Sequence, residues 1–145
     1  MKITVVGAGI VGCAIAHELA SRGARVQLID SRGVGRGATR ASAGILAPHI
    51  EGHIPELRSL AACSLAMYDD FIRRVEQDSG RSIEYNRKGT LQVALDKAEA
   101  LAFAKDARAL AANGVECEML DSDAARRLEP ALSDRVTAAL LVVSD

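Results

Sequence analysis

The first part of the chain alternates between apolar runs and a helical pattern. Residues 1–6 form a short apolar run typical of a strand, and Ala14, Ile15 and Leu19 then recur at the spacing of one helix face. A second apolar run follows over residues 25–29. The pattern predicts a strand, a helix and a second, parallel strand, which together make the βαβ unit of an α/β fold.

The rest of the chain carries a mixed pattern of helices and strands. Apolar positions recur at helical spacing from residue 56 to 78 and predict one amphipathic helix, which Gly80 ends. Asp96 is a favourable N-cap residue for another helix. The further predicted elements are strands at 82–86, 90–95, 115–120 and 136–143, and helices at 96–112 and 122–128.

Three glycines lie between the first strand and the first helix, in the pattern Gly7-x-Gly9-x-x-Gly12. In a phosphate-binding turn, the first glycine permits the tight turn and the second lets the backbone approach a pyrophosphate. The third lets the helix pack closely on the strand, and the helix N-terminus offers N–H groups to the phosphates. Because the glycines stand between a predicted strand and a predicted helix, they indicate a dinucleotide-binding turn.

Asp30 ends the second predicted strand, eighteen residues after Gly12. An acidic side chain there can accept hydrogen bonds from the adenosine ribose, which NAD and FAD share. A 2′-phosphate would meet the negative charge of the carboxylate, so NADP is disfavoured, although Arg32 lies close by. NAD and FAD both remain open on this observation alone.

The segment after Asp30 favours FAD. An NAD-binding domain returns to a third parallel strand within about thirty residues, whereas residues 31–48 are rich in glycine, small residues and hydroxyls. Small side chains let the backbone approach an extended ligand closely. An NAD-dependent dehydrogenase is therefore the less favoured interpretation.

Composition narrows the class of protein further. The chain has 145 residues, a hydrophobic content of 49% and a formal net charge of −1, which suits one ordinary domain core and gives no basic excess for nucleic acid. The longest apolar run, Ala138–Val143, is too short to span a membrane. The glycine turn begins at residue 7 and leaves no room for a signal peptide, so we expect a cytoplasmic protein.

Cysteines and histidines give little support for a metal or disulfide site. The three cysteines are widely spaced and odd in number. Pro48 and Gly52 break any helix that would hold His49 and His53 together, so no metal site is expected. His49 and Glu51 directly follow the small-residue segment, which places them at the rim of an active site as a hypothesis.

Five stretches of the sequence resemble one known family, the FAD-dependent amine and amino-acid oxidases of the D-amino acid oxidase type. Within it, the chain is most similar to the glycine oxidase of thiamine biosynthesis. The stretches are residues 7–12, Asp30-Ser31, residues 38–48, residues 86–94 and residues 128–132. Within the third stretch, the resemblance lies in Ala38-Thr39 and in Ala43 to Pro48.

The resemblance implies FAD contacts in four groups. They are Gly7, Gly9, Ile10, Val11 and Gly12 at the pyrophosphate, Asp30 and Ser31 at the adenosine, Ala38 and Thr39 beyond it, and Ala43, Gly44 and Ile45 along the flavin. The family more often has Glu at the position of Asp30 and Met at the position of Ile45. It implies no catalytic residue within this chain.

The resemblance also implies a fold and an activity. We expect a Rossmann-like FAD-binding βαβ followed by the start of an α+β substrate domain, with residues 1–80 as the N-terminal half of the FAD domain and 81–145 as the beginning of the substrate domain. The implied reaction converts glycine or another small amine or amino acid to an imino product, with molecular oxygen reduced to hydrogen peroxide. A C-terminal half or partner chain would complete the enzyme. The alternative is a nucleotide-binding or interaction module without catalysis.

Overall fold

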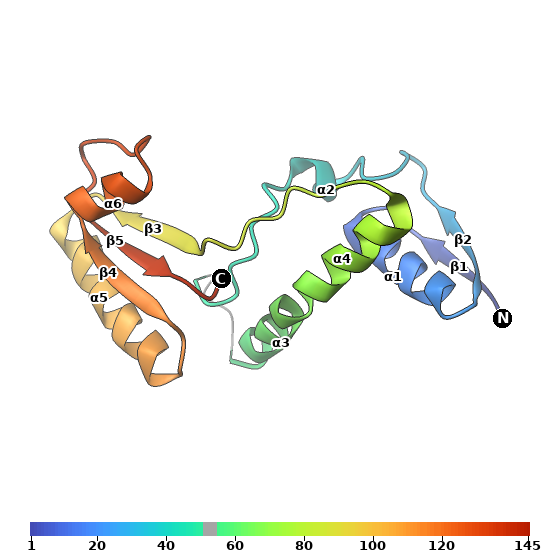
Figure 1. Cartoon of the computed structure of the whole chain (residues 1–145), viewed down its shortest axis with the longest axis horizontal. Coiled ribbons are helices and arrows are strands. Elements are labelled where there is room, and N and C mark those ends of the chain that lie inside the picture. The colour runs from blue at the N-terminus through green and yellow to red at the C-terminus, as the bar shows by residue number, and fades with distance from the viewer. Residues whose placement is uncertain (51–54) are drawn as a thin grey trace. The chain divides into compact units, whose positions relative to one another are not determined.

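The computed structural model describes residues 1–50 and 55–145. These residues form two compact units, Met1–Ile45 and Leu46–Asp145, which we describe separately. The first contains a parallel strand pair and the second an antiparallel sheet with helices (Figure 1), so the predicted α/β class is confirmed. The assignment of residues 1–80 and 81–145 to two enzyme domains stays a prediction.

The first unit is the predicted βαβ. Strand β1 (Lys2–Val6) leads into helix α1 (Ile10–Ser21), which returns the chain to strand β2 (Arg25–Ile29). The two strands are parallel and pair residue for residue along their whole length. The small-residue segment that follows contains a short helix, α2 (Ala38–Ala41), which the sequence pattern did not predict.

The predicted helix over residues 56–78 is wrong in one respect, because it is two helices, α3 (Pro55–Ala66) and α4 (Tyr68–Ser79). The N–H of Met67 donates to the carbonyl of Ser64, three residues back, which tightens and ends α3. Two acidic residues then occupy the first turn of α4, where the helix dipole favours negative charge. The helical spacing of the apolar residues alone does not reveal a break of one residue between two helices.

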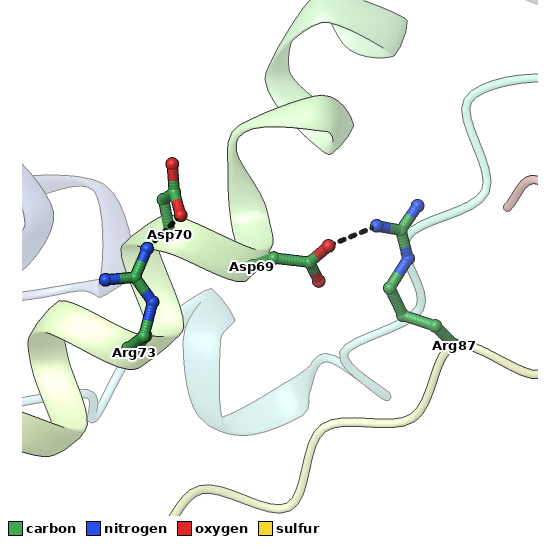
Figure 2. Close-up of polar contacts among 4 residues, drawn as sticks. All are labelled: Asp69, Asp70, Arg73 and Arg87. Carbon is green, nitrogen blue, oxygen red and sulfur yellow. Dashed lines mark hydrogen bonds and ion pairs between the residues drawn. The ribbon is translucent and has the colours of Figure 1, made fainter.

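The predicted strand at 82–86 is also wrong, since no strand is formed there. Side chains of α4 hold this segment instead. The Ile83 N–H donates to Glu76 Oε1 at 2.7 Å, and Arg87 pairs with Asp69 at 2.8 Å. Figure 2 shows Arg87 reaching Asp69. Side chains of α4 therefore provide this segment with the polar contacts that a neighbouring strand would otherwise provide.

Figure 2 also shows a second ion pair on α4, in which Asp70 contacts Arg73. These residues are three apart on the helix, a spacing at which side chains meet. Asp69 thus faces the neighbouring segment, while Asp70 is paired within its own helix.

The second unit contains a three-stranded sheet in the order β3-β5-β4. Its strands are β3 (Thr90–Ala94), β4 (Cys117–Asp121) and β5 (Ala138–Val142), and its helices are α5 (Lys97–Ala112) and α6 (Ser122–Leu128). Both outer strands pair antiparallel with β5, so β3 and β4 run in the same direction with β5 between them (Figure 1). This is a split βαβ arrangement, and it confirms the strands and helices predicted from residue 90 onward.

The core of this unit lies on both faces of β5. Leu140 and Val142 point to one face and pack with Leu110 of α5. Ala139 points to the other and packs with Ala125 of α6. Because both faces are covered, β5 is a continuous apolar run rather than an alternating one.

Asp96 caps α5 as predicted, since its Oδ1 accepts the Glu99 N–H at 2.9 Å. The Glu99 side chain in turn accepts the N–H of Leu95, the residue before the cap, at 2.7 Å, in a reciprocal arrangement similar to a capping box. Replacing Asp96 by Ala is expected to lower the free energy of unfolding by about 1 kcal/mol in a urea titration. Asp96→Asn keeps a capping oxygen and serves as the control; equal losses in both variants would contradict the capping role.

Candidate functional site

The glycine turn of the first unit has the geometry that its sequence predicts. Gly7 has a φ of +104°, which L side chains rarely adopt, and its N–H donates to the Ile29 carbonyl at 2.7 Å. A Cβ on Gly12 would lie 1.8 Å from the Gly7 carbonyl oxygen. Only glycine at position 12 therefore lets α1 approach β1 this closely.

The N-terminus of α1 is left open for an anion. Its cap residue, Gly9, has no side chain to accept an N–H, and the first helical turn contains no acidic residue. Thr39 of α2 provides one acceptor, since its Oγ1 takes the Ile10 N–H at 2.9 Å. No carboxylate of the helix's own first turn thus neutralises the positive end of its dipole, and such an end binds phosphate groups.

Asp30 is half-buried and held by backbone hydrogen bonds on both carboxylate oxygens. The Ala8 N–H donates to Oδ2 at 2.9 Å and the Arg32 N–H donates to Oδ1 at 2.7 Å. These bonds, the one from Ala8 first, hold the pKa of Asp30 below its ordinary value of 3.8. The carboxylate stays ionised at neutral pH, and each oxygen keeps a lone pair with which to accept a ribose hydroxyl.

These groups surround an open pocket of about 380 Å³, a volume within the range of small-molecule sites. It is bounded by the glycine turn, the end of β2 and the start of α2. The lining residues are Gly7, Gly9, Ile10, Val11, Asp30, Arg32, Gly37, Ala38, Thr39 and Ser42.

Seven of the predicted contact residues line this pocket and five do not. The five are Gly12, which packs α1 onto β1, and the residues Ser31, Ala43, Gly44 and Ile45. The last four are exposed within the first unit. Their contacts with FAD stay predictions.

Three lining residues were not predicted as cofactor contacts: Arg32, Gly37 and Ser42. Gly37 caps α2, and a Cβ there would lie 3.0 Å from a guanidinium nitrogen of Arg32. Arg32 lies two residues after the strand-end acid, a position that could have indicated it.

Of the residues considered for an active-site rim or a metal, Glu51 and His53 lie outside the described residues. His49 belongs to the second unit, where its Nδ1 contacts Asp145 Oδ1 at 2.6 Å. Within residues 1–50 and 55–145, no helix combines the length and apolar character needed to cross a membrane.

The parallel strands, the glycine turn and the strand-end acid together define a dinucleotide-binding βαβ unit. The family follows from comparison with known proteins. The model of the FAD dependent oxidoreductase family matches residues 2–145, and the chain belongs to this family.

Individual relatives place the chain at the N-terminal part of larger enzymes. It is 29% identical, over its whole length, to a D-amino acid dehydrogenase of Rhizobium rhizogenes, of which it covers 47%. Glycine oxidase of Bacillus cereus matches 99% of the chain at a TM-score of 0.90 and 26% identity, and the enzyme of Geobacillus kaustophilus matches 98% at 0.90 and 28%. The chain covers 39% of each glycine oxidase.

The close contact at Gly12 predicts a strong effect of a single methyl group. Gly12→Ala is expected to destabilise the first unit by at least about 3 kcal/mol, because its Cβ meets backbone that cannot move without opening the turn. Gly23→Ala is the control, since Gly23 has positive φ but nothing within 4 Å of an added Cβ. That strain costs roughly 1–2 kcal/mol. Urea unfolding that gives equal losses for both variants would contradict the contact.

The lowered pKa of Asp30 predicts a pH dependence of stability. Because the folded-state pKa lies below the unfolded one, the ionised carboxylate stabilises the fold above its ordinary pKa of 3.8. This contribution is lost as the pH falls through the folded-state pKa. We expect the stability difference between the wild type and Asp30→Asn to shrink over that interval, as measured by urea unfolding. Asp134→Asn, at an exposed site, is the control; a wild-type advantage that is constant with pH would contradict the prediction.

Proposed function

We propose that this chain supplies the FAD-binding N-terminal part of a flavoprotein oxidase that acts on glycine or another small amine or amino acid. One observation carries the proposal: the open N-terminus of α1 and the anchored carboxylate of Asp30 line the same pocket. The helix N-terminus can bind the pyrophosphate of FAD, and the neighbouring carboxylate can accept hydrogen bonds from its ribose hydroxyls. Membership of the FAD dependent oxidoreductase family supports this choice of cofactor.

The residues present fit that cofactor. The Cβ-free turn at Gly7, Gly9 and Gly12 would let the pyrophosphate reach the N–H groups of α1, and Ile10 and Val11 begin that helix. Asp30 would accept hydrogen bonds from the ribose hydroxyls. In this proposal Ser31 completes the adenosine side, Ala38 and Thr39 lie beyond it, and Ala43, Gly44 and Ile45 lie along the flavin.

The chemistry of the reaction would come from the flavin, which when bound supplies a hydride acceptor. In this proposal the chain binds and orients the cofactor. In our proposal the amine substrate leaves as an imino product, and molecular oxygen is converted to hydrogen peroxide. The imino product would serve synthesis of the thiamine thiazole.

The similarity to two glycine oxidases supports an oxidase acting on a small amine, whereas the dehydrogenase relative leaves other electron acceptors possible. The chain spans less than half the length of these relatives. We therefore propose that substrate-binding residues lie in a C-terminal part or partner chain. Val6 of the first unit is 82% exposed, and that part would cover it.

FAD binding tests the cofactor assignment. The chain is expected to quench FAD fluorescence saturably. Asp30→Asn should weaken affinity about tenfold or more, because a hydrogen bond to a charged acceptor is stronger than one to a neutral acceptor. Asp30→Glu should retain binding, and Asp134→Asn is the matched control. Wild-type affinity in Asp30→Asn would contradict the ribose role.

The reaction itself requires the polypeptide that joins this chain to its C-terminal part. Glycine should then produce hydrogen peroxide in a peroxidase-coupled assay under air. Reduction of an artificial dye by glycine without peroxide would indicate a dehydrogenase instead, and binding of FAD without turnover of any amine would contradict the oxidase proposal.

A further inference from the structure

Arg32 brings a positive charge to the pocket of the first unit. Among the described residues that line this pocket, it is the one with a cationic side chain. Its backbone is fixed, because the Arg32 N–H donates to Asp30 Oδ1 at 2.7 Å. The side chain therefore starts directly beside the carboxylate that is proposed to bind the ribose.

The guanidinium of Arg32 lies against Gly37. A Cβ built on Gly37 would be 3.0 Å from Nη2, 3.6 Å from Cζ and 3.8 Å from Nη1 of Arg32. The φ of Gly37 is −98°, so a left-handed backbone is not the reason for a glycine at this position. The missing side chain instead leaves room for the guanidinium between the end of β2 and the start of α2.

This location brings the guanidinium close to the open end of α1. Gly37 is the cap residue of α2, and Thr39 in the first turn of α2 accepts the Ile10 N–H at 2.9 Å. A Cβ on Gly9, the cap residue of α1, would lie 3.2 Å from the same Thr39 oxygen. A side chain held at Gly37 is thus two residues along the chain from the group that contacts α1. The cation and the positive end of the helix dipole therefore border the same pocket.

The charge of Arg32 is available to a ligand. Backbone hydrogen bonds from Ala8 and Arg32 lower the pKa of Asp30 most, and the charge of Arg32 lowers this pKa further, so the two side chains are neighbours. Within residues 1–50 and 55–145, however, the guanidinium takes part in no ion pair. A guanidinium presents its N–H groups as a planar fork that matches the oxygens of a phosphate.

We infer that Arg32 is a further cofactor-binding residue, which donates hydrogen bonds to the phosphates of the dinucleotide, and that Gly37 positions it. The inference rests on the proposed FAD site. The N-terminus of α1 and Arg32 both bind the pyrophosphate, while Asp30 binds the ribose. A guanidinium can also stack on an aromatic base, so the experiment has to separate a phosphate contact from a contact with adenine.

Titration of the full chain with ADP and with adenosine, followed by amide NMR, makes this separation, because only ADP carries phosphates. Arg32→Gln should weaken ADP binding about fivefold and leave adenosine binding unchanged. ADP affinity should also fall less steeply with added salt in this variant than in the wild type, because salt screens the charge pair that the variant lacks. Arg25→Gln removes the same charge at the opposite end of β2 and is the matched control.

Three results would overturn the role of Arg32. They are an unchanged ADP affinity in Arg32→Gln, an equal loss for adenosine, which would place the side chain at the base, and a salt dependence equal to that of the wild type. Asp30→Asn separates this inference from the flavin proposal. If Asp30→Asn weakens ADP binding and Arg32→Gln does not, the cofactor site stands without Arg32, whereas a wild-type chain that binds no ADP would contradict both.

Gly37→Ala tests the positioning. The added methyl group should displace the guanidinium and weaken ADP binding in the wild-type background, but cause little further loss in Arg32→Gln. Equal losses in both backgrounds would mean that the methyl group obstructs the ligand directly, and would overturn the positioning role of Gly37. The amide spectrum of each variant shows that its fold is retained.

Discussion

The approach of α1 to β1 at Gly12 is the constraint on which the first unit depends. Helix and strand can touch there only because no Cβ separates Gly12 from the Gly7 carbonyl. The contact sets the position of the first helical turn, and so the direction of its N–H groups. Any side chain at residue 12 would displace the N-terminal end of the helix from the pocket, even if every other pocket residue were unchanged.

Asp30 links that turn to the second strand. Its carboxylate joins the Ala8 N–H of the turn to the Arg32 N–H after β2, so it is part of the scaffold as well as of the pocket. The two roles are compatible because an ionised carboxylate has more acceptor sites than these two donors occupy. A side chain already held by the backbone loses little rotamer freedom on meeting a ligand, which is the advantage of preorganisation.

Features set by local sequence could be predicted, and those set by distant contacts could not. The glycine turn and the Asp96 cap each depend on residues within a few positions, and both have the expected geometry. Residues 82–86 have a strand-like composition, but their partners are side chains of α4, which periodicity does not reveal.

The pocket shows the same limit. Residues of the turn and Asp30 were found from their motif, and Arg32 follows Asp30 closely enough to have been found with them. Ser42 lines the pocket because the chain folds back through α2. The break between α3 and α4 lies where the Met67 N–H donates to the Ser64 carbonyl. The spacing of apolar residues is the same for one continuous helix as for two consecutive helices, so it does not reveal this break. The sequence motif thus indicates the residues of the turn and of the strand end. It does not indicate how the segment that contains α2 folds to complete the pocket.

The order of strands in the second sheet has a consequence for the order in which the protein is made. Strands β3 and β4 pair with β5 and not with each other, and β5 is the last of the three in the sequence. During synthesis from the N-terminus, both outer strands leave the ribosome before the strand that joins them. Helix α5, with its own local cap, can form early, but the sheet must wait for residues 138–142, and until then the backbones of β3 and β4 are open to wrong partners.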